Sequence, residues 1–302
     1  DALEESHRQA ALARDADAAR AEVQAHLDEA LRVADDGESR LGAIQATLRG
    51  AEERLRERSD ELAGELARWR GHDRLQVAAI PRFALSCSTA LMTEAARLAG
   101  ERGMWVSTHV AENREECRLA CERFGSADYL EVYESLGLIH ERTVLAHCIH
   151  FSSDEWDRLA RAGAVVAHCP DSNAFLGSGS MPVGEVLARD LALAIGSDVA
   201  AGRSLRITTA LAHAYDNGLR TGVRLDPRRL LWWGTRGGAL ALGHDRVGLL
   251  APGMAADMVL HPLPAHVVGE QATLASLIFD GDRGAPLRTW VGGRLVHGDA
   301  TA

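Results

Sequence analysis

Several short apolar runs of this chain stop at a polar residue that can do chemistry. His109, His147 and Asp198 each close such a run, and Glu112 follows His109 by three residues. Two imidazoles and a carboxylate are donors that suit a borderline divalent ion such as Zn²⁺ or Fe²⁺. Such an ion lowers the pKa of a bound water towards about 7, and a nearby carboxylate can then shuttle the proton of that water. The pattern therefore predicts metal-assisted hydrolysis, with Glu112 as the proton shuttle.

Each of these residues also has a purely structural explanation. A histidine at a strand end often only forms hydrogen bonds, Glu112 could be an acid in a first helical turn, and Asp198 could be an N-cap. The spacing alone leaves the two explanations equally open. Recurrence at equivalent places of successive units favours a shared site, whereas His150 and His168 are expected to be structural.

The apolar runs have the spacing of βα units. They begin roughly 20 to 40 residues apart, and each is followed by a loop and a helical stretch. Continuous apolar runs of this kind are typical of parallel strands buried on both faces. The carboxyl ends of such strands face the active-site mouth, so the polar residues are expected to converge there. We predict an α/β chain, either a (β/α)8 barrel or a doubly wound sheet, with these strands: Leu75–Ile80, Met104–His109, Thr143–Cys148, Ala164–Cys169 and Leu191–Asp198.

The two ends of the chain differ from this middle part. Residues 1–58 contain no proline, are rich in Ala, Arg, Glu and Asp, and are predicted to be helical, either as an amphipathic helix on its own domain or as an oligomerising arm. Helices follow residue 205, with Trp232 and Trp233 expected in the core. Short strand-like pieces then indicate a small β domain, so the predicted parts are 1–58, 59–250 and 251–302. The proline-free helical stretch continues to about residue 70, and its apolar stripe is Leu41, Ile44, Leu48, Leu55 and Leu62.

The composition excludes several classes of function. All 33 basic residues among the 302 are Arg, so Schiff-base chemistry, a P-loop lysine and a metal site bridged by a modified lysine are excluded. The charge sum of 33 − 43 = −10 argues against a broadly basic nucleic-acid face. No apolar run of the roughly 20 residues that span a bilayer is present, and no signal peptide is visible. Five cysteines without a CxxC pair indicate free thiols, so we expect a cytoplasmic protein.

Several sequence motifs of the chain resemble those of the guanine deaminases of the amidohydrolase superfamily. The resemblance runs from about residue 59 to 297 and implies strands four to eight of a (β/α)8 barrel followed by part of a small β-sandwich. Within the superfamily, the motif "PRFALSCS" resembles the enzymes whose substrate is guanine. The segments that carry it are "IPRFALSCS", "STHVAENREEC", "VLAHCIHFSSDE", "VVAHCPDSNAFLGSGSMP", "AIGSDVAAG" and "GTRGGALALGHDRVGLLAPGMAADMVL".

The resemblance implies a role for each residue of the site. His109 and Asp198 would bind the metal, zinc or Fe²⁺, and Asp198 would also take a proton from the attacking water. Glu112 would protonate the purine ring and carry protons to the leaving amine. His147 would hydrogen-bond the bound water or the tetrahedral intermediate.

The resemblance also implies a substrate, and the four residues above would border it. Arg82 would donate to the guanine carbonyl and Phe83 would line the pocket. The family reaction converts guanine and water to xanthine and ammonia, so the chain is expected to be a zinc-dependent aminohydrolase of guanine catabolism that cleaves a cyclic amidine C–N bond. From the residues alone, Arg82 could equally be a salt-bridged surface arginine.

One element of the family pattern is missing. The family has an HxH pair on its first barrel strand and a glutamine after it, but none of the 13 histidines here stands two residues from another. Two protein ligands rarely hold zinc, so we expect zinc to be weakly held or absent. An arc of five strands also leaves two open edges. Residues 1–58, which could be a foreign or out-of-frame stretch, or another chain such as a homodimer partner would have to cover them.

Two rival functions remain. The chain could be another amidohydrolase acting on an aminated heterocycle, or a non-catalytic truncated relative whose helical arm binds a partner.

Overall fold

The structure is a computed structural model that describes residues 74–280 and 286–299, with isolated positions before residue 74. The chain divides into two compact units, residues 1–76 and 77–302. Nearly all of the predicted helical part, residues 1–58, lies outside the described residues, so its structure and the predicted boundary at residue 58 stay predictions. All residues of the predicted site lie in the second unit.

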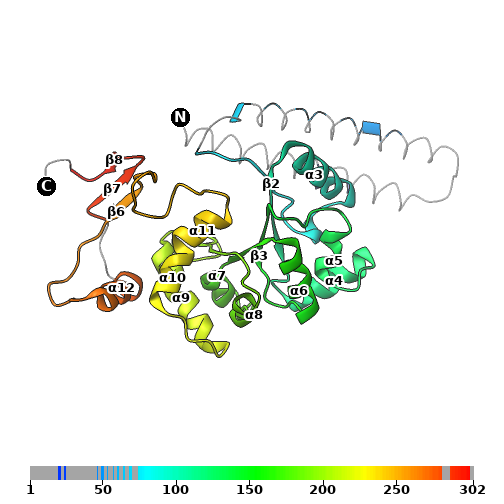
Figure 1. The fold of residues 1–302 in the computed structure, drawn as a ribbon. Helices are drawn as coiled ribbons and strands as arrows, with labels where there is room; N and C mark the ends of the chain where they lie inside the picture. The colour runs from blue at the N-terminus through cyan, green and yellow to red at the C-terminus, as the bar shows by residue number, and fades with distance from the viewer. Residues whose placement is uncertain are drawn as a thin grey trace. The chain divides into compact units, whose positions relative to one another are not determined.

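A parallel five-stranded sheet forms the centre of the second unit (Figure 1). Its strands are β1 (Ala78–Ala79), β2 (Trp105–Val110), β3 (Thr143–His147), β4 (Val165–His168) and β5 (Leu193–Ile195). Each strand pairs with the next one along the chain, in parallel orientation. A doubly wound sheet reverses its strand order at one point, and this sheet does not. The expected α/β arc of a (β/α)8 barrel is therefore confirmed, and the doubly wound alternative is wrong.

One face of the sheet is fully buried, whereas several positions on the other face are only half-buried. Val106, Leu145 and Val166, one from each central strand, are completely buried. The register sets Val110 opposite His147, so β2 and β3 end at the same level. The polar residues at the strand ends therefore emerge along one edge of the sheet.

Helices connect the strands and end where the sequence places capping residues (Figure 1). Ser152 begins α6 by accepting a hydrogen bond from the Glu155 main-chain N–H, while Glu155 accepts one from the Ser152 main-chain N–H. Gly163 ends the same helix with φ +68°, a left-handed conformation that favours glycine. The connecting helices are α3 (Thr89–Arg102), α4 (Arg114–Phe124), α5 (Tyr129–Glu134), α6 (Ser153–Ala162), α7 (Pro170–Phe175) and α8 (Val183–Ala188).

After β5 the chain forms helices and then a small antiparallel sheet, as the sequence predicts. The helices are α9 (Ile207–Arg220), α10 (Pro227–Gly234), α11 (Arg236–Ala241) and α12 (Glu270–Phe279), and the sheet contains β6 (Met258–Leu260), β7 (Arg288–Val291) and β8 (Arg294–His297). Within the described ranges, no helix combines the length and apolar character needed to cross a bilayer.

The expectation for the tryptophan pair is half wrong. Trp233 is 4% exposed and belongs to the core, whereas Trp232 is 44% exposed. Both lie on α10, and neighbouring residues of a helix point about 100° apart, so one helix cannot bury both against the same surface.

Candidate active site

His109 is fixed near the end of β2 by the loop that follows β1. The Arg82 carbonyl accepts a hydrogen bond from the His109 main-chain N–H at 3.0 Å and lies 2.8 Å from His109 Nδ1. Because a carbonyl oxygen only accepts, Nδ1 carries the proton and Nε2 keeps its lone pair. Metal-binding histidines commonly have this arrangement, in which the second ring nitrogen donates to a carbonyl.

His147 is held beside His109 in a tight turn. The two ring centroids are 5.2 Å apart. His147 has φ +74°, and the Cys148 N–H donates to the Ala146 carbonyl at 3.1 Å across it. This is a γ-turn of the rare, strained kind, which costs of the order of 1–3 kcal/mol and tends to occur at functional sites.

The His147 ring has one satisfied nitrogen and one that is not. Nδ1 lies 2.7 Å from Asn173 Oδ1 on α7, so Nδ1 donates there. Nε2 is buried and has no hydrogen-bond partner within the described part of the chain, although the residue is only 1% exposed. A buried nitrogen lone pair without a partner is costly unless a ligand fills the space beside it.

Glu112 faces this unsatisfied nitrogen. Its Oε2 lies 3.7 Å from His147 Nε2, and the Ser178 hydroxyl donates to its Oε1 at 3.0 Å. The N-cap of α4 is Asn113, so Glu112 precedes the helix and is not an acid of its first turn. The structural explanation for Glu112 is therefore wrong, and the carboxylate lies between a ring nitrogen and a hydroxyl.

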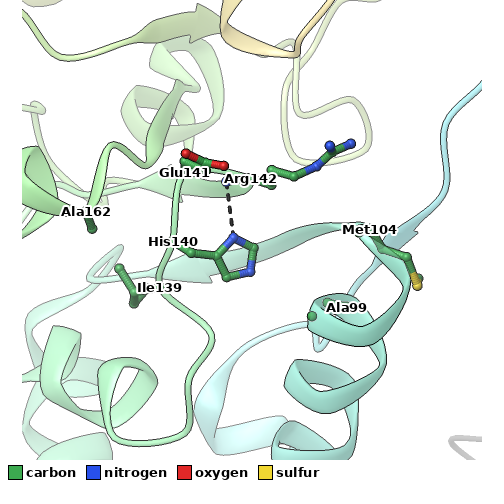
Figure 2. Close-up of a pocket in the computed structure, with 9 residues that line it drawn as sticks. Ala99, Met104, Ile139, His140, Glu141, Arg142 and Ala162 are labelled. Carbon is green, nitrogen blue, oxygen red and sulfur yellow. Dashed lines mark hydrogen bonds between the residues drawn. The ribbon is translucent and has the colours of Figure 1, made fainter.

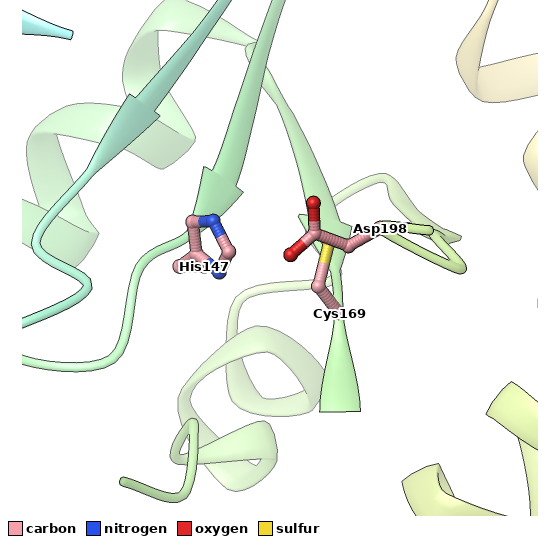
Figure 3. Close-up of side chains that lie close together, drawn as sticks. All are labelled: His147, Cys169 and Asp198. Carbon is pink, nitrogen blue, oxygen red and sulfur yellow. The ribbon is translucent and has the colours of Figure 1, made fainter. Parts of the chain in front are cut away.

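Asp198 and Cys169 complete the group (Figure 3). One donor atom each from His147, Cys169 and Asp198 lie within 4.8 Å of one another. Asp198 has φ +45°, and its carbonyl accepts the Gly202 N–H at 2.5 Å in a tight loop. Since α9 begins only at Ile207, Asp198 does not cap it, and the N-cap explanation for Asp198 is wrong.

The sulfur of Cys169 is deeply enclosed. Burial raises the pKa of Cys169 to about 12, so the thiol is protonated when no cation is near. A Cβ at Gly196 would lie 2.9 Å from the Cys169 sulfur. The chain of β5 can therefore approach Cys169 only because residue 196 is glycine. All five cysteines are free, as predicted.

Arg82 and Phe83 lie next to His109, through the Arg82 carbonyl described above. The Arg82 side chain is exposed, and its guanidinium carbon lies 5.8 Å from the centre of the Phe83 ring. Among the residues that the structure describes, no carboxylate pairs with Arg82. The salt-bridge explanation thus has no support there, and the guanidinium is available to a ligand.

A buried carboxylate fastens the loop that carries Asp198. Asp171 on α7 accepts hydrogen bonds from the Arg203 main-chain N–H at 2.7 Å and from Arg203 Nε at 2.9 Å. Burial disfavours the charge of Asp171, but the hydrogen bonds from Arg203 and the nearby His213 outweigh it and lower its pKa. Helix α7 thus holds both the ring of His147, through Asn173, and the loop after Asp198.

His168 and His150, which are expected to be structural, differ in their burial and contacts. His168 is completely buried, and burial, with a smaller effect of His147, lowers the pKa of its imidazole to about 3, so the ring is neutral. His150 Nε2 donates to the Ser178 carbonyl at 3.0 Å.

Two hollows lie at opposite ends of the strands. One, of about 520 Å³, is at the amino ends of β2 and β3 around His140 and Arg142 (Figure 2). The other, of about 500 Å³, is lined by His150, Arg114 and Ser178, and Ser178 is the hydroxyl that binds Glu112. Barrel enzymes have their active sites at the carboxyl ends of the strands, so the second hollow is the candidate route by which a substrate reaches the site.

The structure brings all six predicted residues to the carboxyl ends of the strands. The analysis of the sequence missed Cys169, Asn173 and Ser178. Cys169 could have been found, because it closes the fourth apolar run just as His109, His147 and Asp198 close the others. Asn173 and Ser178 carry no such signal, since their contacts depend on how the segment after β4 folds back.

The donors fit a zinc ion. Imidazole nitrogen, cysteine sulfur and carboxylate oxygen are its usual protein ligands, and the buried Nε2 of His147 has no hydrogen-bond partner among the residues that the structure describes.

Comparisons with known proteins point to one family. Residues 11–296 match the amidohydrolase family. The chain is 34% identical over 244 residues to guanine deaminase of Escherichia coli K12, covering 77% of this chain and 56% of that protein. The solved E. coli structure matches with a TM-score of 0.76, covering 80% of this chain and 60% of that one.

Two further relatives bear on substrate and metal. The chain is 36% identical over 233 residues to 8-oxoguanine deaminase of Pseudomonas aeruginosa, covering 74% of this chain and 51% of that protein. An adenosine deaminase of Xanthomonas campestris, solved with bound zinc, is 27% identical with a TM-score of 0.69, covering 79% of this chain and 55% of that one.

The chain thus spans little more than half the length of the curated relatives it matches. The family match nevertheless extends over most of its residues. The parallel arc and the polar groups at its strand ends agree with that match, and the chain belongs to the amidohydrolase family.

Proposed function

We propose that this site removes the amino group of guanine by hydrolysis, giving xanthine and ammonia. The observation that carries the proposal is the convergence of Glu112, His147 and Asp198 at the carboxyl ends of the strands. The similarity to a guanine deaminase supports the choice of substrate. His109 and Asp198 are the proposed metal ligands, and a bound Zn²⁺ or Fe²⁺ would supply a water of lowered pKa.

The residues of the chain would handle the protons. Asp198 accepts a proton from the attacking water and passes it to Glu112, which donates it to the ring nitrogen beside the carbon that bears the amine. Because Nδ1 of His147 donates to Asn173, its Nε2 accepts a hydrogen bond from the attacking water. Glu112 then carries the second proton to the leaving amine, which departs as ammonia.

The loop after β1 would bind the purine. Arg82 donates to the guanine carbonyl, and Phe83 packs against the ring from a position beside His109. A buried hydrogen bond to a charged donor is worth about 1.5–3 kcal/mol, so Arg82 would contribute mainly to binding.

The cellular setting is also proposed. We infer a cytoplasmic enzyme, since its five cysteines are free thiols. A homodimer is the proposed assembly, because β1 and β5 are the outer strands of the described sheet and a second chain would cover their open edges.

The test is turnover by the metal-loaded chain, followed as the change in purine absorbance with guanine, 8-oxoguanine and adenosine in parallel. Faster turnover of guanine than of the other two is expected. Turnover of another amine without turnover of guanine would show a different amidohydrolase. One further candidate is a non-catalytic relative, and no turnover of any amine by a chain with bound metal would support it.

A further inference from the structure

We propose that Cys169 is a metal ligand in this chain and that His147, Cys169 and Asp198 together bind a zinc ion. The inference concerns the metal site of the proposed function and differs from it in two respects: His147 binds the ion itself rather than a water, and His109 is not a ligand of the ion. It rests on that function only for the presence of a metal.

The geometry of the three donors comes first. Their donor atoms lie within 4.8 Å of one another at the ends of β3, β4 and β5 (Figure 3). Zinc bonds of about 2.0–2.3 Å place tetrahedral ligands about 3.5 Å apart. The three atoms therefore need to close by about 1 Å to bind one ion.

The His147 ring provides independent support. Its Nε2 is buried and lacks a hydrogen-bond partner in the described ranges, while the residue is 1% exposed. Its Nδ1 donates to Asn173 Oδ1 at 2.7 Å, which fixes the tautomer that leaves Nε2 free to bind an ion. An imidazole oriented in this way has the form of a metal ligand.

The chemistry of Cys169 suits a zinc ion, which accepts thiolate sulfur together with imidazole nitrogen and carboxylate oxygen. A set of one nitrogen, one sulfur and one oxygen donor leaves the fourth position open, as catalytic zinc sites do. Binding replaces the Sγ–H bond of Cys169 by an Sγ–Zn bond, and the thiol proton passes to the solvent.

The surroundings keep the sulfur in place. Gly196 permits β5 to approach, because a Cβ there would lie 2.9 Å from the sulfur. Glu112 stands 3.7 Å from His147 Nε2 and so faces the same space. Its carboxylate adds negative charge beside the cation, which favours binding.

The experiment is a Co²⁺ titration of the full chain, followed by absorption spectroscopy. A thiolate ligand gives an intense sulfur-to-cobalt charge-transfer band in the near ultraviolet. We expect this band in the unaltered chain, its loss in Cys169→Ser with at least about tenfold weaker zinc binding, and its retention in His109→Ala. Cys121→Ser is the matched control, since Cys121 is a half-buried free thiol on α4.

Four results would overturn the inference. These are the absence of metal binding, a cobalt complex without the band, a band that survives in Cys169→Ser, and loss of metal binding in His109→Ala alone. If Cys169→Ser fails to fold, X-ray absorption of the zinc-loaded unaltered chain decides, because one sulfur at about 2.3 Å is required. A chain with the band but without guanine turnover would keep this inference and refute the proposed function.

Discussion

Asn173 is expected to orient His147, and its replacement by alanine gives the sharpest test of the site. The change removes the acceptor of the 2.7 Å hydrogen bond from His147 Nδ1, and both residues are almost fully buried. Leaving a buried donor without a partner costs about 1–3 kcal/mol. The His147 turn, with φ +74°, would also lose part of what holds it.

We expect Asn173→Ala to lower the free energy of unfolding by about 2 kcal/mol. For a unit of this size that corresponds to a fall in Tm of about 4–8 °C. Metal affinity should fall by about 10–100-fold, because an outer partner of a metal-binding histidine contributes that much. Thermal melting of the metal-free chain and zinc titration measure the two effects separately.

The chain offers a matched control in Asn217. It is another buried helical asparagine, and its Nδ2 donates to the Met181 carbonyl at 2.8 Å, outside the site. Asn217→Ala should cost a similar amount of stability and leave metal affinity unchanged. Equal effects of the two substitutions on metal affinity would refute the role of Asn173.

Three further predictions concern catalysis, binding and acid stability. Glu112→Gln should keep the metal and lower kcat by about 10²–10⁴-fold, since it removes the proton shuttle; unchanged kcat in steady-state assays would contradict that role. Arg82→Ala should raise KM for guanine by about tenfold or more with little change in kcat, because it removes a charged donor, and a fall in kcat alone would count against it. The pKa of Asp171 is lowered in the folded chain, so its contribution to stability is present above its usual value of 3.8 and is lost as pH falls through the lower folded value. Asp171→Asn should therefore lower stability at neutral pH and flatten its decline below about pH 4 in urea titrations, and an unchanged acid profile would show that Asp171 is not responsible.

The strands could be predicted from the sequence because each one is a short, nearly continuous apolar run that stops at a polar residue. The convergence of His109, His147 and Asp198 at one edge followed from the parallel direction of those strands. Periodicity could not decide between a barrel arc and a doubly wound sheet, because strand order is a property of pairing between distant segments.

Other features depend on packing that the sequence does not display. The exposure of Trp232 follows from the angle between neighbouring residues of α10. Asn173 meets His147 only because α7 turns back over the end of β3, and the prediction therefore contained the donors of the site but not the residue that orients one of them.

The hydrogen bonds between Asp171 and Arg203 hold the loop that carries Asp198, and a different segment of the chain borders the hollow beside the site. His147 stands on a strand and Asp198 on the loop that Arg203 holds, whereas the segment from Ser178 to Ser180 forms part of the wall of the neighbouring hollow. Changes in that wall can alter which heterocycle fits while the strand ends stay as they are. Substitutions meant to change the substrate preference should therefore be made first in residues 178–180, with Asp171 and Arg203 left unchanged.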